Sequence, residues 1–180
     1  TTQEAVELSV GRTQAPALGP QDVAIEVKAW GVNFIDVLAG VGLHPVIQDP
    51  RWVPGHEVAG RVTAVGAAVS DLVPGDRVMA LLERGGYARQ VATPRHLVMR
   101  LPEQLSFTEG AGVLVTGLTA IACVEEAGKV APGDRVLVQS AAGATGQAVV
   151  QLALHHGAEV LGTASTGAKL EALRQLGVRY

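Results

Sequence analysis

Hydrophobic and polar residues alternate along much of the first hundred residues, and this period of two predicts half-buried β-strands. The clearest run consists of Val23, Ile25, Val27 and Ala29. Further short strands are expected in residues 57–66, 76–82, 87–93 and 96–101. Glycine and proline pairs that favour turns separate these runs. Residues 33–40 place apolar side chains on one helical face, so a single short helix is expected among the strands.

The pattern changes at Ser106, which has the spacing of a helix N-cap with Glu109 as its capping-box partner. Small apolar residues then continue through residues 110–123 and predict a helix. We therefore expect a domain boundary near residue 105. It would separate a strand-rich domain, residues 1–105, from an α/β domain, residues 106–180.

Residues 136–162 combine an apolar strand, a glycine-containing turn, an apolar helix starting near Gln147 and a second strand. The turn has a serine at the first glycine position of the G-x-G-x-x-G pattern, and Gly143 and Gly146 at the other two. The first of these glycines lets the backbone approach a pyrophosphate, and the second lets the helix pack on the strand. The anion would lie at the helix N-terminus. The expected cofactor-binding residues of this turn are Ala142, Gly143, Ala144, Thr145 and Gly146.

The end of the second strand indicates which dinucleotide this turn would bind. An acidic residue that binds the ribose 2′-hydroxyl of NADH is expected there, but the chain reads Thr163, Ala164 and Ser165. A serine hydroxyl and the nearby Lys169 would accept a 2′-phosphate, which a carboxylate would repel. NADPH is therefore the expected cofactor. The alternative is an α/β turn without a nucleotide, in which Lys169 is a solvated helix charge.

Composition narrows the choice of partners. With 48% hydrophobic residues, 17% charged residues and a net charge of −3, the sequence is typical of a globular protein without a basic surface for nucleic acid. No apolar run reaches the roughly 18 residues that a membrane span needs, and the first residues do not resemble a signal sequence, so a cytoplasmic location is expected. The single cysteine, Cys123, has apolar neighbours, which favours a packed core thiol over a nucleophile.

Several segments of the chain resemble the medium-chain dehydrogenase/reductase superfamily, in the zinc-free branch of quinone oxidoreductases and enoyl reductases. The segments that carry the resemblance are GVNFIDVLAGVGLHP (31–45), VPGHEVAGRVTAVG (53–66), VPGDRVMAL (73–81), GGYARQVA (85–92), GLTA (117–120) and VLVQSAAGATGQAVVQLA (136–153). Residues 162–180 look most like enoyl reductase domains of modular polyketide synthases. The resemblance implies a GroES-like β-barrel followed by the first part of a Rossmann doubly wound parallel sheet. Because a full sheet of this kind needs more strands, the chain looks truncated.

Asp36, His56 and Glu57 match the zinc alcohol dehydrogenase branch of the superfamily, in which they belong to a zinc site. In that branch cysteines stand where this chain has Asn33 and the segment 114–116. Without both thiolates, a lone histidine beside a glutamate cannot close a tetrahedral site, so no metal is expected. His56 and Glu57 are instead expected to form a hydrogen-bonded or partly buried pair.

The resemblance also implies roles for three residues near the reacting end of the cofactor. Asn33 matches an asparagine close to the nicotinamide and the substrate, and it is equally suited to cap the helix that it opens. His44 stands where relatives have a tyrosine, and it is either a proton donor or an exposed loop histidine. Thr119 matches a residue that touches the nicotinamide, or it serves helix packing.

The leading hypothesis is an NADPH-dependent enoyl reductase that acts on an acyl thioester, with the substrate attached to an acyl carrier protein of a polyketide synthase. A free-standing quinone or enone reductase is the nearest alternative. A catalytically silent superfamily member is an alternative from a different class. A homodimer is a further expectation of the resemblance.

Overall fold

The computed structural model describes residues 9–12, 14, 17–43 and 52–179 of the 180-residue chain. Contacts between residues divide the chain into two compact units, Thr1–Leu114 and Val115–Tyr180. The first unit carries the strand-rich pattern, and the second carries the glycine-containing turn. The assignment of residues 1–105 and 106–180 to separate domains stays a prediction.

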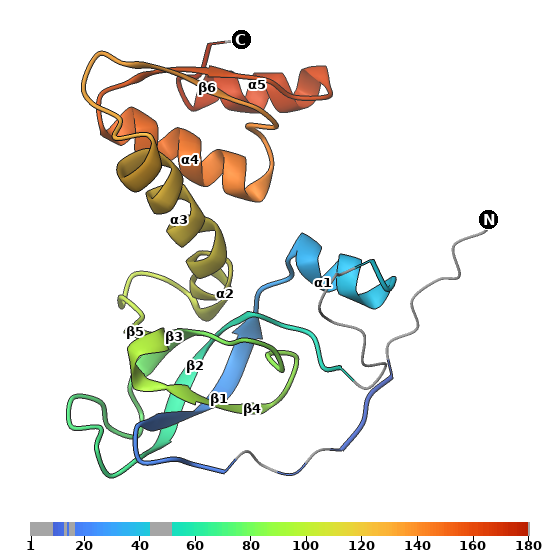
Figure 1. Ribbon diagram of the computed structural model, residues 1–180, viewed down its shortest axis with the longest axis vertical. Helices are drawn as coiled ribbons and strands as arrows, with labels where there is room; N and C mark the ends of the chain where they lie inside the picture. The colour runs from blue at the N-terminus through green and yellow to red at the C-terminus, as the bar shows by residue number, and fades with distance from the viewer. Residues whose placement is uncertain (1–8, 13, 15–16, 44–51, 180) are drawn as a thin grey trace. The chain divides into compact units, whose positions relative to one another are not determined.

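The first unit is built on a curled five-stranded antiparallel sheet in the order β4-β1-β2-β3-β5 (Figure 1). Its strands are β1 (Asp22–Trp30), β2 (Glu57–Val65), β3 (Arg77–Leu81), β4 (Gln90–Pro94) and β5 (Val98–Arg100). The pairing of β1 with β2 shifts register twice, between Ala24 and Ile25 and between Val27 and Ala29. Such irregularities bend a strand and increase its twist, which suits a curled sheet. The expected GroES-like β-rich fold is confirmed.

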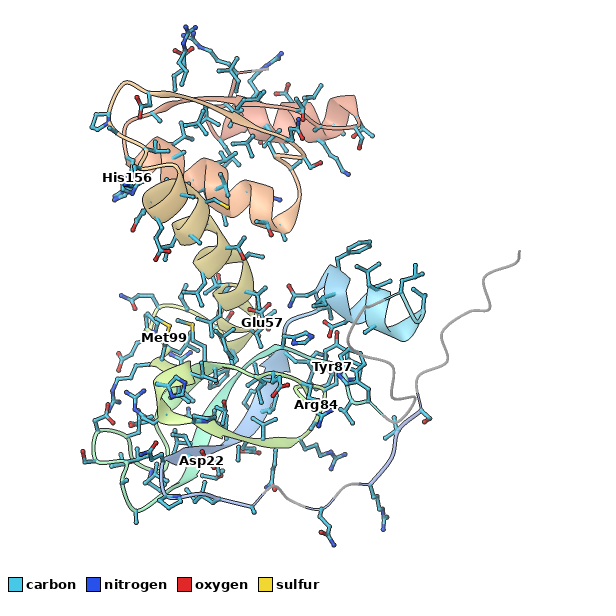
Figure 2. The ribbon with its side chains drawn as sticks, viewed as in Figure 1. Asp22, Glu57, Arg84, Tyr87, Met99 and His156 are labelled. Atoms are coloured by element: carbon cyan, nitrogen blue, oxygen red, sulfur yellow. The ribbon has the colours of Figure 1, made fainter. Side chains whose placement is uncertain are left out.

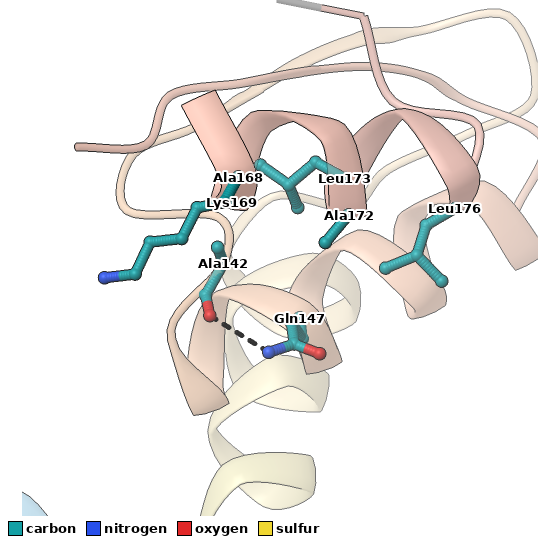
Figure 3. A pocket seen from close by; sticks show the side chains of 7 residues that line it. All are labelled: Ala142, Gln147, Ala168, Lys169, Ala172, Leu173 and Leu176. Carbon is teal, nitrogen blue, oxygen red and sulfur yellow. Dashed lines mark hydrogen bonds between the residues drawn. The ribbon is translucent and has the colours of Figure 1, made fainter. Parts of the chain in front are cut away.

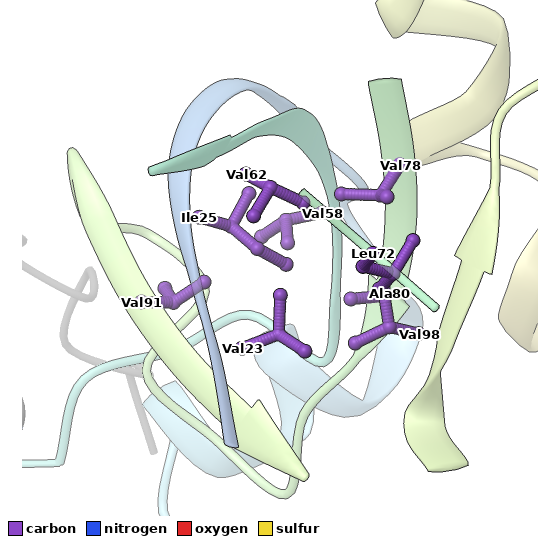
Figure 4. Close-up of a cluster of buried hydrophobic side chains, with 9 residues drawn as sticks. All are labelled: Val23, Ile25, Val58, Val62, Leu72, Val78, Ala80, Val91 and Val98. Carbon is purple, nitrogen blue, oxygen red and sulfur yellow. The ribbon is translucent and has the colours of Figure 1, made fainter. Parts of the chain in front are cut away.

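The concave side of this sheet holds a core of valine, leucine, isoleucine and alanine side chains (Figure 4). In β1, Val23 and Ile25 are buried as the alternating pattern predicted, whereas Val27 and Ala29 are only half-buried. Because β2 lies in the middle of the sheet and is covered on both faces at its start, its first four residues are all buried. Ala59 belongs to the second of these faces, which packs against Ala111 and Leu114.

The helices of the first unit include α1 (Phe34–Gly40), the 3-10 turn η1 (Arg95–Leu97) and α2 (Phe107–Ala111). The predicted capping box at the start of α2 is present: the Glu109 N–H donates to Ser106 Oγ, and the Ser106 N–H donates to the Glu109 carboxylate. Although α2 follows residue 105, it packs on β1, β2 and β3. The helical pattern predicted from Ser106 onward is present but interrupted, because the chain breaks after α2 and starts again as α3 (Leu114–Ile121).

The prediction that Cys123 is a core thiol was wrong, because this residue is exposed. After α3 the chain continues as a π-helical turn, η2 (Ala122–Ala127). Hydrogen bonds from residue i to i+5 give a π-turn more residues per turn than an α-helix, so the buried face changes register. Val124, 1% exposed, is the residue that the turn buries.

The second unit follows the predicted order of strand, turn, helix and strand. Its elements are β6 (Arg135–Val138), α4 (Ala144–His155), β7 (Glu159–Gly162) and α5 (Gly167–Gln175). β6 and β7 pair in parallel, and Arg179 forms a further parallel bridge with Leu161. A core cluster that includes Val150, Val160 and Leu173 joins both helices to the two strands. This arrangement confirms the first part of a parallel α/β sheet. Among the described residues, no helix combines the length and the apolar character that crossing a membrane requires.

Candidate functional site

The glycine-containing turn is anchored to the end of the neighbouring strand β7. The N–H of Ser140 donates to Thr163 Oγ1 at 3.2 Å, and the N–H of Ala141 donates to the Thr163 carbonyl at 2.9 Å. Thr163 in turn donates its own N–H to the Val138 carbonyl at 3.0 Å. The sequence marks Thr163 only as a position without a carboxylate. In the structure this residue holds the turn in position.

The two glycines of the turn differ in their surroundings. A β-carbon at Gly146 would lie 2.4 Å from the Ser140 carbonyl oxygen, so only glycine lets α4 pack this closely on the turn. At Gly143, a β-carbon would meet only that same oxygen, at 3.2 Å, and the residue is exposed. This geometry supports the predicted roles of close packing for Gly146 and of an open backbone approach for Gly143.

Helix α4 begins at Ala144, earlier than the Gln147 that the sequence predicted, because Gly143 is its N-cap. The Gln147 N–H already donates to the Gly143 carbonyl at 2.8 Å, and its side chain donates to the Ala142 carbonyl at 2.9 Å. The N–H groups of the first helical turn have no partner within an α-helix. Ala144 and Thr145 are exposed, so this helix end can receive an anion such as a pyrophosphate.

The end of β7 leads directly into the N-terminus of α5, where the residues predicted to bind the 2′-phosphate lie. Ser165 is exposed, and Thr166 is the N-cap of α5, with its hydroxyl accepting from the Lys169 N–H at 3.4 Å. Lys169 and Ala142 lie at one end of a shallow hollow of about 250 Å³, and Leu176 lies at the other (Figure 3). The structure therefore brings the side chain of Lys169 near the turn. It also adds Thr166 to the candidate phosphate-binding residues, and the position of this threonine directly before a helix is an N-cap signal that the sequence contains.

Ser140 adopts a left-handed backbone conformation, with a φ of +52°. This conformation suits glycine, the usual residue at the first position of the motif, and is unfavourable for residues with a β-carbon. We expect Ser140→Gly to raise the free energy of unfolding by about 0.5–1 kcal/mol. Denaturant unfolding measures the change. Lys129→Gly, at a φ of +47°, is the matched variant that should also stabilise, whereas Ser106→Gly, at a φ of −69°, should not. A loss of stability in Ser140→Gly would contradict this explanation.

The first unit holds a polar cluster centred on Asp36, which is only 7% exposed. Its Oδ2 accepts from the Asn33 N–H at 2.9 Å and from the Tyr87 hydroxyl at 3.2 Å, and its Oδ1 accepts from the Gly55 N–H at 2.9 Å. Tyr87 also lies against Trp30, with ring centroids 5.7 Å apart. Figure 2 labels Tyr87 and Glu57 in the first unit. One carboxylate therefore joins α1, the segment before β2 and the segment before β4. No local pattern in the sequence indicates that Tyr87 belongs to this cluster, because its hydrogen bond to Asp36 joins residues that are far apart in the chain.

The cluster raises the pKa of Tyr87 to about 12, because burial disfavours the phenolate and because Asp36 repels it. The ordinary value is 10.0, so the folded protein binds more protons than the unfolded chain between pH 10.0 and about 12. We therefore expect the free energy of unfolding to fall as the pH rises through this range. Denaturant unfolding at a series of alkaline pH values measures the slope. Tyr87→Phe should flatten it, and an unchanged slope in that variant would assign the effect to other groups.

Asn33 lies at the N-cap of α1, as one of the two readings of the sequence predicted, and forms a capping box with Asp36. Its side-chain Nδ2 donates to Glu57 Oε1 at 2.9 Å. Glu57 is 2% exposed, whereas the adjacent His56 is only partly buried. His56 Nε2 lies 3.7 Å from Asp36 Oδ1 and makes no hydrogen bond within the described structure. Among the described residues, no three or more histidine, cysteine, aspartate and glutamate side chains form a group that could hold a metal ion.

Of the other two residues that the resemblance places near the reacting end of the cofactor, the structure describes Thr119 but not His44. Thr119 is exposed, and its hydroxyl donates to the Val115 carbonyl of the same helix at 2.7 Å. Such a bond is common for threonine within helices. His44 lies outside the described residues. The roles of both residues stay predictions.

A curled antiparallel sheet with a buried polar cluster and a strand–turn–helix–strand unit with an open helix end are the two parts expected of a member of the medium-chain dehydrogenase/reductase superfamily. Comparison with known proteins agrees. Residues 19–103 match the alcohol dehydrogenase GroES-like domain family. The chain is 50% identical over 167 residues to the pikromycin polyketide synthase component PikAII of Streptomyces venezuelae, covering 92% of the chain and 4% of that protein. It is 39% identical to the human synaptic vesicle membrane protein VAT-1 homolog, and the match covers 97% of this chain and 44% of that protein.

Solved structures show the same relationship. The CurK enoyl reductase has a TM-score of 0.89 at 38% identity, covering 94% of this chain and 53% of that chain. The Escherichia coli quinone oxidoreductase, solved in complex with NADPH, has a TM-score of 0.84 at 30% identity. The match covers 93% of this chain and 52% of that chain. The chain belongs to the medium-chain dehydrogenase/reductase superfamily, in its branch of quinone oxidoreductases and enoyl reductases. It spans about half the length of these solved structures, and a smaller share of the two sequence relatives.

Proposed function

We propose that this protein is an NADPH-dependent enoyl reductase that reduces the α,β-double bond of an acyl thioester, without zinc, as a domain of a polyketide synthase. Residues 1–105 would form the substrate domain, and residues 106–180 the first part of the NADPH-binding domain. The observation that carries the cofactor assignment is the end of β7, where Ser165, Thr166 and Lys169 surround the start of α5. A cation, two hydroxyl groups and a helix N-terminus at this place suit a phosphate.

Each part of the dinucleotide has candidate partners in the chain. The exposed first turn of α4, with Ala144 and Thr145, would donate backbone N–H groups to the pyrophosphate. Gly143 would let the pyrophosphate approach the backbone. Ser165 and Lys169 would bind the 2′-phosphate, and Thr119 would lie near the nicotinamide. The groups present therefore fit the cofactor.

Bound NADPH would supply the hydride that the β-carbon of the unsaturated thioester accepts. The chain's own contribution is to orient the substrate and to stabilise the negative charge that develops on the thioester oxygen. The Nδ2 group of Asn33 is the proposed donor to that oxygen. His44 is the proposed acid that delivers a proton to the α-carbon. The resemblance to polyketide synthases supports a substrate carried on an acyl carrier protein.

The second candidate is a free-standing NADPH-dependent quinone or enone reductase. The solved quinone oxidoreductases of Escherichia coli and of Pseudomonas syringae, at 30% and 34% identity, favour it. Both candidates use the same cofactor site, so the acceptor distinguishes them.

The test follows the loss of NADPH absorbance by the whole protein with a short 2-enoyl thioester and with a simple quinone, and NADH is the control. Turnover of the thioester with NADPH is the expected result, and prior treatment with a metal chelator should leave the rate unchanged. Turnover of the quinone alone would assign the protein to the second candidate. NADPH binding without turnover of either acceptor would favour a catalytically silent member.

A further inference from the structure

Glu57 is the most deeply buried carboxyl group among the described residues, at 2% exposure, and it opens the central strand β2. Burying a carboxylate costs several kcal/mol unless hydrogen bonds compensate for the lost water. One such bond is the 2.9 Å contact between Asn33 Nδ2 and Glu57 Oε1. A stable barrel does not itself need a carboxylate here, since an apolar side chain of similar volume would avoid this cost. The contact with Asn33 therefore points to a role beyond packing.

The backbone makes room for this contact at Gly31. A β-carbon at Gly31 would lie 2.3 Å from Glu57 Oε1 and 2.4 Å from the Ala111 carbonyl oxygen. The backbone N–H of Gly31 donates to the Glu57 carbonyl at 3.0 Å, which holds the two strands together at this point. Only glycine at this position lets the Glu57 side chain lie where it meets Asn33. Gly31, which follows β1, thus makes room for Glu57, the first residue of β2, to contact the amide group of Asn33 at the start of α1.

Asn33 is held from both sides. Its backbone N–H donates to Asp36 Oδ2 at 2.9 Å, which fixes the start of α1, and its Nδ2 donates to Glu57. An amide group can be rotated so that its oxygen and nitrogen exchange places, but an ionised carboxylate accepts only and thus selects the nitrogen end. One of the two Nδ2 hydrogens bonds to Glu57, and within the part of the chain that the structure describes the second meets no acceptor.

We propose that Glu57 is a positioning residue that orients the Asn33 amide, so that its second Nδ2 hydrogen serves as a donor to a carbonyl oxygen of the substrate or cofactor. This inference rests on the proposed function, because it assigns Asn33 the role of a donor in that reaction. Glu57 touches neither ligand and acts through Asn33. Without the carboxylate, the amide can present its oxygen instead of its nitrogen, and the donor is then lost in part of the molecules.

A double-mutant cycle with Glu57→Gln and Asn33→Ala in the whole protein tests this inference. Glu57→Gln keeps the shape of the side chain but can donate as well as accept. We expect it to lower kcat about 10-fold in the presence of Asn33 and less than about 2-fold in the Asn33→Ala background. The KM for NADPH should stay unchanged in both backgrounds. An equal loss of kcat in both backgrounds would overturn the proposal, because Glu57 would then act independently of Asn33.

Thr93→Val is the matched control for a general loosening of the sheet. Thr93 is 3% exposed, lies in β4 of the same sheet, and donates its hydroxyl to the Leu81 carbonyl at 2.9 Å. Its hydrogen bonds involve neither Asn33 nor Glu57. This variant should lose stability and keep kcat within about 2-fold of the original. A fall in kcat as large as that of Glu57→Gln would overturn the positioning role in favour of a structural one.

A readout without turnover separates this inference from the proposed function. If neither the thioester nor the quinone reacts, the proposed function fails, and the side-chain amide resonances of Asn33 decide the positioning role. Asn33 is the only asparagine of the 180 residues, and Asn33→Ala assigns its signal by loss. We expect Glu57→Gln to shift this amide pair and to speed its exchange with water. An unchanged resonance with unchanged exchange would overturn the proposal.

Discussion

Replacing Ser165 with aspartate should remove the preference for NADPH over NADH. The substitution puts a carboxylate where we place the 2′-phosphate, so repulsion replaces a hydrogen bond. We expect the affinity for NADPH to fall about 10- to 100-fold, which corresponds to about 1.4–2.7 kcal/mol. The affinity for NADH should stay the same or rise a few-fold, because a carboxylate at this place accepts hydrogen bonds from the ribose hydroxyls. Fluorescence titration with each cofactor measures both constants.

Ser70→Asp is the control for the added negative charge, since Ser70 is an exposed serine of the first unit. It should change neither affinity. An equal loss of NADPH and NADH binding in Ser165→Asp would mean that the substitution disturbs the turn or the start of α5. Unchanged NADPH binding would show that the 2′-phosphate does not lie at Ser165, and the assignment of this residue would then be wrong.

Replacing Asp36 with alanine should destabilise the first unit more than any other single change discussed above. It removes the acceptor of two backbone N–H groups, those of Asn33 and Gly55, and of the Tyr87 hydroxyl. A buried donor that is left without a partner costs about 1–3 kcal/mol. Part of the cost is recovered by relaxation and water entry, so we expect the free energy of unfolding to fall by about 3–5 kcal/mol. Denaturant unfolding of the whole protein measures it.

Asp71→Ala is the matched control, because Asp71 is an exposed aspartate of the same unit that pairs with Arg95. Solvent screens an exposed ion pair, so this variant should lose little stability. Asp36→Asn keeps an acceptor oxygen and should fall between the two. It should also lower the pKa of Tyr87 from about 12, since the charge of Asp36 contributes to that shift. A loss in Asp36→Ala no larger than that in Asp71→Ala would show that the three donors find other partners.

The superfamily and the order of elements could be predicted from the sequence because their signals are local. Alternation marked β1, proline and glycine pairs marked the turns, and the spacing of Gly143 and Gly146 marked the turn before α4, although α4 begins earlier than the predicted Gln147. The capping box of Ser106 and Glu109 marked the start of α2. The prediction that Cys123 is buried failed, because it assumed a regular helix through this residue. The small apolar residues 110–123 indicated helix, but they did not indicate the break between α2 and α3 or the π-turn in which Cys123 is exposed.

The candidate site likewise has parts with a local sequence signal and parts that depend on contacts between distant residues. The sequence by itself determined the turn, the residues at the start of α5 and the absence of a carboxylate at the end of β7, because all of these lie within about thirty consecutive residues of one βαβ unit. Only the tertiary structure decided the partners of Asp36 and Glu57. Asp36 meets Tyr87 across 51 positions, and Glu57 meets Asn33 across 24. Contacts over such separations depend on strand register and on the space beside Gly31, and no periodicity in the sequence encodes either one.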